Sequence, residues 1–251
     1  MDVLSFRWRA KYGHFLRAEA NVNALTYPVP PRTSVLGLLA AILGLEKDEL
    51  AGELQDTRIA VTGTAPRRFW HRIKLRKDPP TPLPWQVKKN QRGTDSPKPE
   101  KATLILQEWL LDPDFLIHVT LPNQPERFAE LVSRVREHRW HFTPCMGLSE
   151  LLCDVEFIAC QQAQPLPAGQ FEIQGSCLMS QVRLLAGDGI GVHLLRMPYS
   201  VSADRVFTHA AYYLEHQGRP FLVEINPIEQ GLEQQTTNTA WQVGEWVLLF
   251  S

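Results

Sequence analysis

The stretch TYPVPPRTSVLGLLAAILG, residues 26–44, decides the fold of the first part of the chain. Its three prolines restrict the backbone and remove amide donors, so the chain must arrive extended before it turns helical. Thr33 is expected to cap the helix and Gly44 to end it. Apolar side chains recur at helical spacing and predict one buried face: Val35, Leu36, Leu39, Ile42 and Leu43.

Arg32, Thr33 and Ser34 gather at the expected start of this helix. Free amide groups and the positive end of the helix dipole lie at such a position, and a guanidinium adds a full charge. The pattern therefore predicts a phosphate site. An ordinary capped core helix is the alternative interpretation.

The composition indicates a globular protein that works without a membrane span. The chain has 251 residues, of which 44% are hydrophobic, so it can bury one large core or two modest ones. The longest apolar run, residues 35–45, is far shorter than the ~20 residues that a membrane helix needs. The first ten residues alternate instead of forming the apolar segment of a signal peptide, so a cytoplasmic location is expected.

The four cysteines predict neither a metal site nor a cofactor. They form no CxxC pair and have no histidine nearby at ligand spacing, so they are interpreted as buried or idle thiols. Asp112 and Asp114 flank a proline and are interpreted as turn residues rather than metal ligands. The cysteines are Cys145, Cys153, Cys160 and Cys177.

Charge is concentrated in one segment. Between Pro66 and Lys101 there are eleven Lys or Arg residues against three acidic ones, a net charge of +8. The remaining residues hold 15 basic and 24 acidic side chains and carry −9. The segment is also rich in proline and poor in aliphatic residues, so it cannot form a core of its own. It is predicted to be a protruding basic arm.

The basic arm also contains aromatic side chains, among them Phe69, Trp70 and Trp85. Positive charges neutralise phosphates and aromatic rings stack on bases, so this mixture predicts contact with a nucleic-acid strand. A solvated charged loop is the alternative. The residues predicted to contact RNA in the arm are Arg67, Arg68, Arg72, Lys74, Arg76, Trp85, Lys88, Lys89 and Arg92.

The regular elements around the arm predict an α+β fold. Apolar alternation or helical spacing gives the order β-α-β-insert-β-α-β, which is the split βαβ arrangement of ferredoxin-like and RNA-recognition-motif (RRM) folds. Strands are expected at 4–10, 58–64, 103–110, 115–121 and 151–160, and helices after residue 33, at 48–54 and at 126–138.

The second part of the chain is predicted to be smaller and rich in strands. Residues 1–165 are expected to form the first domain, with the insertion at 66–102, and residues 166–251 a β-rich C-terminal region packed on it. Strand-like runs occur at 171–185, 192–197, 205–214, 221–225 and 241–250.

Three motifs occur in an order that resembles a known family. They are the proline-led helix at 26–44, QEWLLDPDFLIHVTL at 107–121 and HFTPCMGLSE at 141–150. Together they resemble the RAMP-superfamily CRISPR-associated subunit that caps the 5′ handle of the guide RNA (crRNA) in type I Cascade complexes. The resemblance spans about residues 1–160.

The resemblance implies a modified ferredoxin-like domain with a β-hairpin thumb, and the basic arm falls where that thumb would be. It also implies one copy at the foot of an antiviral ribonucleoprotein complex. The expected partners are crRNA, the backbone (filament) subunit and the large subunit, with target DNA contacted only through the complex and no membrane partner.

A single-stranded handle needs helix-terminus donors, cations and aromatic platforms. Tyr27 and Trp140 could equally be core aromatics, because amphipathic rings often close a hydrophobic layer. The residues predicted to contact the handle are Tyr27, Arg32, Thr33, Ser34, Trp140, His141, Met146 and Gly147.

No catalytic residue is predicted. One branch of the resembling family cleaves precursor crRNA without metal and carries a Lys-His pair before a proline–glycine turn, whereas His138–Thr143 here contains no such pair. A metal-independent endoribonuclease using His141 and Arg139 remains the first alternative to a non-catalytic subunit. An RRM-like RNA-binding protein outside CRISPR systems is the second.

Overall fold

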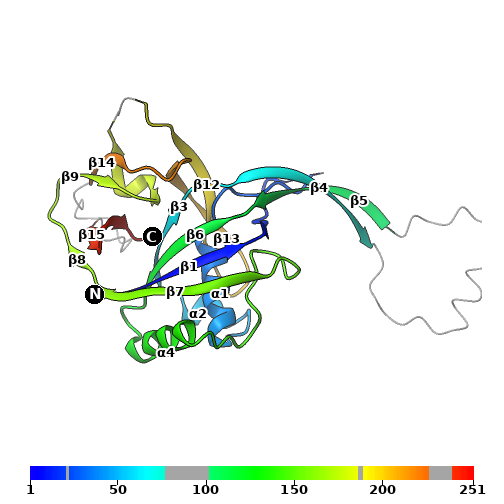
Figure 1. The fold of residues 1–251 in the computed structure, drawn as a ribbon, viewed down its shortest axis with the longest axis horizontal. Helices are drawn as coiled ribbons and strands as arrows, with labels where there is room; N and C mark the ends of the chain where they lie inside the picture. The colour runs from blue at the N-terminus through cyan, green and yellow to red at the C-terminus, as the bar shows by residue number, and fades with distance from the viewer. Residues whose placement is uncertain (21–22, 77–101, 186–188, 226–238) are drawn as a thin grey trace, which may run out of the picture.

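The computed structural model describes residues 1–20, 23–76, 102–185, 189–225 and 239–251. The first part of the chain is built on an antiparallel four-stranded sheet with the strand order β3-β6-β1-β7 (Figure 1). Its strands are β1 (Asp2–Ala10), β3 (Arg58–Gly63), β6 (Asp114–Thr120) and β7 (Cys153–Gln162).

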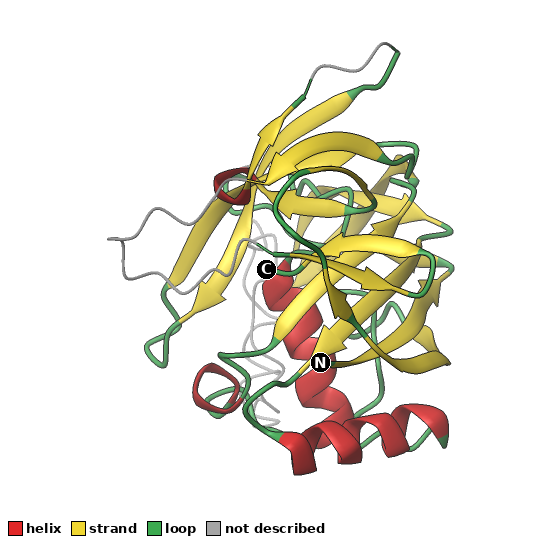
Figure 2. Cartoon of the chain, turned by 90° about the vertical axis from the view of Figure 1, so that its left-hand side faces the viewer, coloured by secondary structure: helices red, strands yellow, loops and turns green. Residues whose placement is uncertain are grey.

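The helices lie together on one side of this sheet (Figure 2). They are α1 (Arg32–Leu43), α2 (Leu50–Glu53) and α4 (Pro125–Arg136). Along the chain the sheet strands and the two longer helices follow the order β1-α1-β3-β6-α4-β7, which is the predicted order. The fold is thus a mixed one, with mostly antiparallel sheets and few helices. No helix in the part of the chain that the structure describes is long and apolar enough to cross a membrane.

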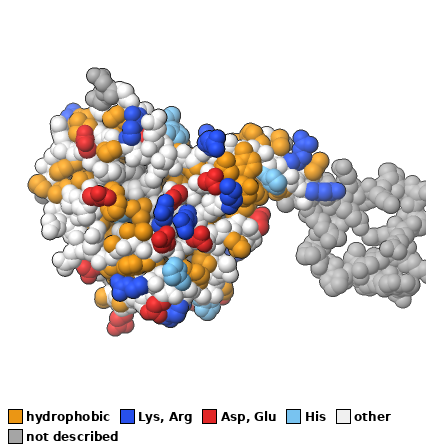
Figure 3. Space-filling view, in the orientation of Figure 1, with side chains coloured by type: hydrophobic (Ala, Val, Ile, Leu, Met, Phe, Trp, Pro, Cys, Tyr) orange, Lys and Arg blue, Asp and Glu red, His pale blue; other side chains and the backbone are white. Residues whose placement is uncertain are grey.

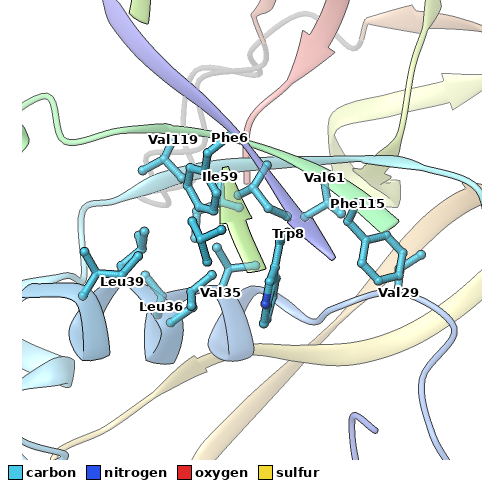
Figure 4. Close-up of a cluster of buried hydrophobic side chains, with 14 of the residues drawn as sticks. Phe6, Trp8, Val29, Val35, Leu36, Leu39, Ile59, Val61, Phe115 and Val119 are labelled. Atoms are coloured by element: carbon cyan, nitrogen blue, oxygen red, sulfur yellow. The ribbon is translucent and has the colours of Figure 1, made fainter. Parts of the chain in front are cut away.

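The core forms between the sheet and α1 because apolar residues alternate along β1. Leu4, Phe6 and Trp8 are buried on the helix side of the sheet. Figure 4 shows side chains of the strands pointing toward Val35 and Leu39 of α1. Burying one large apolar side chain stabilises the fold by about 1.5–3 kcal/mol, so this layer supplies much of the driving force for folding.

The predicted start of α1 is wrong. The helix begins at Arg32, the N-cap is Pro31, and no side chain caps the first turn. The carbonyl of Pro31 instead accepts hydrogen bonds from the amides of Ser34 and Val35. The predicted end is confirmed, because Gly44 adopts a left-handed φ of 84° that favours glycine.

A long hairpin is inserted between β3 and β6 and projects from the body of the molecule (Figure 1). It consists of β4 (Arg67–Arg76) and β5 (Ala102–Leu111), and β5 also pairs with the short β2 (Tyr12–Gly13). Of the predicted arm residues, Trp85, Lys88, Lys89 and Arg92 lie outside the described residues. Arg76 is described only as backbone.

Among the described residues, the second part of the chain forms three small antiparallel sheets, and the predicted strands at 192–197, 205–214 and 221–225 are confirmed. The predicted run 171–185 is divided among several short elements, and 241–250 is a hairpin that turns at Gly244. The elements are β8 (Gln164–Pro165), β9 (Gln170–Ile173), β10 (Ser176–Leu178), η1 (Met179–Gln181), β11 (Val182–Leu184), β12 (Val192–Val201), β13 (Phe207–Glu215), β14 (Phe221–Ile225), β15 (Ala240–Val243) and β16 (Trp246–Leu249).

These strands pack against both sides of the first part. Tyr212 and Leu214 of β13 belong to the same core cluster as the α1 side chains. The β15–β16 hairpin covers part of the opposite, outer face of the four-stranded sheet, where the Trp246 ring lies 5.2 Å from the ring of the buried His118. The two regions therefore share a core. The division of the chain at residue 165 stays a prediction.

Candidate nucleic-acid interface

The β4–β5 hairpin has two chemically different faces because neighbouring residues of a strand point to opposite sides. One face, called here the basic face, consists of Arg68, Trp70, Arg72 and Lys74 of β4 with Leu104 and Leu106 of β5, and all of these side chains are exposed. The indole of Trp70 is 50% exposed. In Figure 3 the described part of the hairpin shows Lys and Arg side chains beside hydrophobic ones.

The opposite side of the hairpin, called here the aromatic face, is formed by Tyr12, Phe69, His71 and Trp109. The Trp109 ring lies 4.3 Å from that of His71, 5.5 Å from that of Tyr12 and 6.1 Å from that of Phe69. Such ring contacts contribute about 0.5–1.5 kcal/mol each beyond burial. Because Tyr12 belongs to β2, the cluster fastens the hairpin to the body of the protein.

Two cations of the basic face, Arg72 and Lys74, have no ion-pair partner among the described residues. Arg68 lies 3.3 Å from a carboxylate oxygen of Glu108, whose other oxygen accepts a hydrogen bond from the amide of Thr26. Exposed cations next to an exposed indole can neutralise phosphates and stack on a base. This part of the hairpin therefore has the chemistry of a single-strand contact.

A groove of about 680 Å³ lies on the outer face of the sheet, at the base of the hairpin. Its walls include Arg67, Leu116 and Trp246. Arg7 in this groove is paired with Asp114, with Nε donating to the carboxylate at 2.7 Å. Beyond the groove the β15–β16 hairpin packs against Val3 and Ala60, so it covers part of the sheet face on which an RRM stacks bases.

The predicted phosphate site at Arg32 is contradicted by its surroundings. The side chain is 7% exposed, and its guanidinium donates to the main-chain oxygens of Gln55, Thr57, Tyr199 and Ser251 at 2.6–3.2 Å. Burial lowers the pKa of this guanidinium. Arg32 therefore joins three chain segments as a structural residue, and four of its five N–H donors are already used.

Two further handle residues are core side chains. Tyr27 is 1% exposed and Met146 is fully buried, so neither side chain can reach an RNA strand. This is the alternative that the sequence left open for Tyr27. Trp140 is half-buried and packs against the same core cluster, as do many aromatic rings at the end of a helix.

The remaining handle residues lie near α1 but do not form one site with Arg32. Thr33 and Ser34 are half-buried in its first turn. His141 is exposed, and its amide donates to the carbonyl of Ile42, at the other end of the helix. A 12-residue helix is about 18 Å long, so His141 and Arg32 lie far apart.

Gly147 is required by packing, whatever its part in binding. Its φ is 93°, and a Cβ atom placed there would lie 1.8 Å from the carbonyl oxygen of His14. Gly147 and Ser34 both line an apolar groove of about 500 Å³ beside α1, which also includes the exposed ring of Phe142. These are the two predicted handle residues that the structure brings to a common surface.

Sequence reasoning missed part of the hairpin surface. Leu104 and Leu106 belong to the basic face, and Tyr12 and Trp109 to the aromatic face, although none was assigned to the site. Residues 103–110 are predicted to form a strand, but the sequence could not show which strand pairs with it. In the structure β5 pairs with β4 along its whole length, and this register decides which side chains share a face.

A family model described as "CRISPR-associated protein (Cas_Cas5)" matches residues 3–169. No curated protein matches the chain. The fold is similar to a chain in a structure described as "CRISPR RNA-guided surveillance complex", with a TM-score of 0.53 and 16% identity over 87% of this chain and 91% of the other. It is also similar to a CRISPR protein from Archaeoglobus fulgidus, with a TM-score of 0.51 and 16% identity over 99% and 98% of the two chains.

Proposed function

The chain belongs to the Cas5 family of CRISPR-associated proteins, and from this premise we propose that it is a non-catalytic, guide-RNA-binding subunit of a type I Cascade complex. In this proposal it caps the 5′ handle of crRNA and bridges the backbone and large subunits in the cytoplasm. Target DNA meets the protein only through the assembled complex. The β1-α1-β3-β6-α4-β7 unit acts as a ferredoxin-like RAMP domain with the β4–β5 hairpin as its thumb.

The observation that carries the proposal is the basic face of the hairpin. Arg72 and Lys74 are exposed cations without a described partner, and the exposed indole of Trp70 precedes them on the same face. A backbone-tracking set of cations next to a stacking ring fits a single strand better than a duplex. The hairpin projects from the body, so an RNA strand can run along it without displacing the core.

The surroundings of Arg139 support a non-catalytic role. Its guanidinium donates to Glu137 at 2.6 Å and to the hydroxyl of Ser133 at 3.0 Å, so two of its groups are already engaged. The His141 ring lies 4.6 Å from that of Phe142. Metal-free RNA cleavage needs a base, an acid and a cation at one phosphate, and a guanidinium that is bound to Glu137 and Ser133 is less available as that cation.

The RNA-binding proposal is tested with Arg72→Ala/Lys74→Ala. The matched control is Arg183→Ala/Arg196→Ala, which removes the same charge from exposed side chains of β11 and β12. Affinity for a crRNA carrying the repeat handle is measured over a salt series. Two lost phosphate contacts should lower the slope of log K against log salt by about 1.4, and the control should keep the wild-type slope. Equal slopes for all three proteins would contradict the proposal.

The non-catalytic part is tested separately. Labelled precursor repeat RNA is incubated with the purified protein in EDTA and analysed on a denaturing gel. We expect intact RNA after incubation at enzyme excess. A single specific product that disappears in His141→Ala would instead establish the endoribonuclease alternative.

A further inference from the structure

Two histidines outside the surfaces described above lie ring against ring. His193 belongs to β12 and His216 follows the end of β13, and their ring centroids are 3.9 Å apart at an angle of 87°. In the strand register His193 lies opposite Leu214, so His216, two residues further on, reaches the same side of the sheet. His193 is exposed and His216 is half-buried, so both rings are accessible from solvent.

The backbone places this histidine pair at the base of the hairpin. The carbonyl of His216 accepts a hydrogen bond from the amide of Ala65 at 2.9 Å, two residues before β4 begins. The hydroxyl of Thr64 donates to the carbonyl of Gln217 at 3.2 Å. Gly218 also packs closely against Gly63: a Cβ atom placed on Gly218 would lie 3.0 Å from the carbonyl oxygen of Gly63.

The acidic groups near the pair already have partners. Glu215 is buried, accepts hydrogen bonds from the amides of Gln217 and Arg219, and binds the Arg219 guanidinium at 3.0 Å. Glu108 is paired with Arg68. Among the described residues neither imidazole of the pair has a hydrogen-bond partner, so both rings are available to a ligand.

The surroundings of His216 lower its pKa and so favour its neutral imidazole when no ligand is bound. Burial, His193 and Arg68 lower the pKa of His216, and Glu215 acts in the opposite direction. An anion placed between the rings and Arg68 would reverse this balance, because it stabilises the protonated form of each ring. Protonation and anion binding at this position must therefore reinforce each other.

We propose that His193 and His216 form a phosphodiester-binding site that continues the basic face of the hairpin to its base and tightens when its imidazoles take up protons. The inference rests on the proposed function, since the phosphodiester would belong to the RNA strand lying on the hairpin. Arg68 is the shared element, because it is the member of the basic face that acts on His216.

The test compares crRNA affinity of the wild type and His193→Gln/His216→Gln between pH 5.5 and 8. Each proton taken up on binding changes the affinity by up to about tenfold per pH unit above the pKa of the free imidazole. We expect the wild-type affinity to rise as the pH falls and the double variant to lose most of that dependence. The matched control is His138→Asn, which changes an exposed histidine elsewhere and suits its left-handed φ of 53°.

Histidine NMR on the wild-type protein gives a second readout that needs no variant. Adding crRNA should raise the pKa of two imidazoles, and the same two resonances should be missing from the double variant. A double variant with the full wild-type pH dependence, or imidazoles unaffected by RNA, would overturn the histidine site. Absence of RNA binding by the wild type at every pH would overturn the proposed function itself.

Discussion

The start of α1 and strand β4 both present arginines next to groups that could bind phosphate, yet the structure uses them in opposite ways. Arg32 is buried and donates to four main-chain oxygens. Arg72 is exposed on a projecting strand and has no described ion-pair partner. The comparison teaches that an arginine beside a helix N-terminus is an anion site only if its donors remain free after folding.

The largest effect is expected from Arg32→Ala. Removing the guanidinium leaves buried main-chain oxygens without donors, so the free energy of unfolding should fall by about 3–5 kcal/mol. Denaturant unfolding measures it, and crRNA affinity of the folded fraction should be unchanged. Arg32→Lys should recover only part of the loss, because one ammonium cannot reach all three segments. A variant of wild-type stability that no longer binds RNA would reverse the comparison.

The buried side chain of His118 should make the stability of the protein depend on pH. Burial lowers the pKa of His118 to about 3. In the unfolded chain this histidine has its ordinary pKa near 6.5. Below that pH the unfolded state binds a proton that the folded state does not, so the free energy of unfolding decreases as the pH is lowered. Unfolding at pH 5 should be easier than at pH 7 by about 2 kcal/mol from this residue alone. His118→Gln should lack that share of the pH dependence, and an equal pH dependence would contradict the buried, neutral ring.

Much of the first part of the fold could be predicted from the sequence, because its signals are local. The alternation in β1 and the helical spacing in α4 need only neighbouring residues, and the structure confirms the strand and the helix. The burial of Val3 and Ser5 on the outer side of β1 was not predicted, because it depends on distant segments. The role of Arg32 could not be predicted in this way. Its four acceptors come from positions between 55 and 251, and no local pattern shows which distant carbonyls will surround a side chain.

In the hairpin, too, local sequence patterns did not show which side chains would lie together. Charge and aromatic content predicted a binding surface in the arm, but the assignment of residues to two faces required the register of β4 with β5. The covering of the outer sheet face likewise depends on β15 and β16, which lie more than a hundred residues further along the chain. The chemical character of the arm could therefore be predicted from the sequence. The exposure of its individual side chains could not, because it depends on packing against distant segments.

The difference between the two hairpin faces predicts that Trp70→Ala and Trp109→Ala act on different properties of the protein. Trp70→Ala should weaken crRNA binding by about 1 kcal/mol, the lower end of the range for a stacked base, and leave stability unchanged. Trp109→Ala should act mainly on stability, because its ring contacts three others on the aromatic face. Thermal melts and RNA titrations on both variants measure the two effects. Equal losses of affinity would mean that the faces do not differ in function.

The smallest effect is expected from Thr33→Ala. No side chain caps α1, so the usual cost of about 1 kcal/mol for losing a cap should not appear, and the change should stay below roughly 0.5 kcal/mol. Thermal melts of this variant beside Arg32→Ala give the measurement. A loss as large as that of a true N-cap would mean that Thr33 caps the helix after all.

The most direct test of the account locates the RNA on the unaltered protein. A crRNA with 4-thiouridine in its 5′ handle is bound, irradiated and digested, and the crosslinked peptides are identified by mass spectrometry. The account predicts crosslinks in the peptide that contains Trp70 and Arg72, with the segment 26–44 unmodified. Crosslinks confined to residues 27–34, with an unmodified hairpin, would contradict the claim that exposure on the hairpin makes the RNA site.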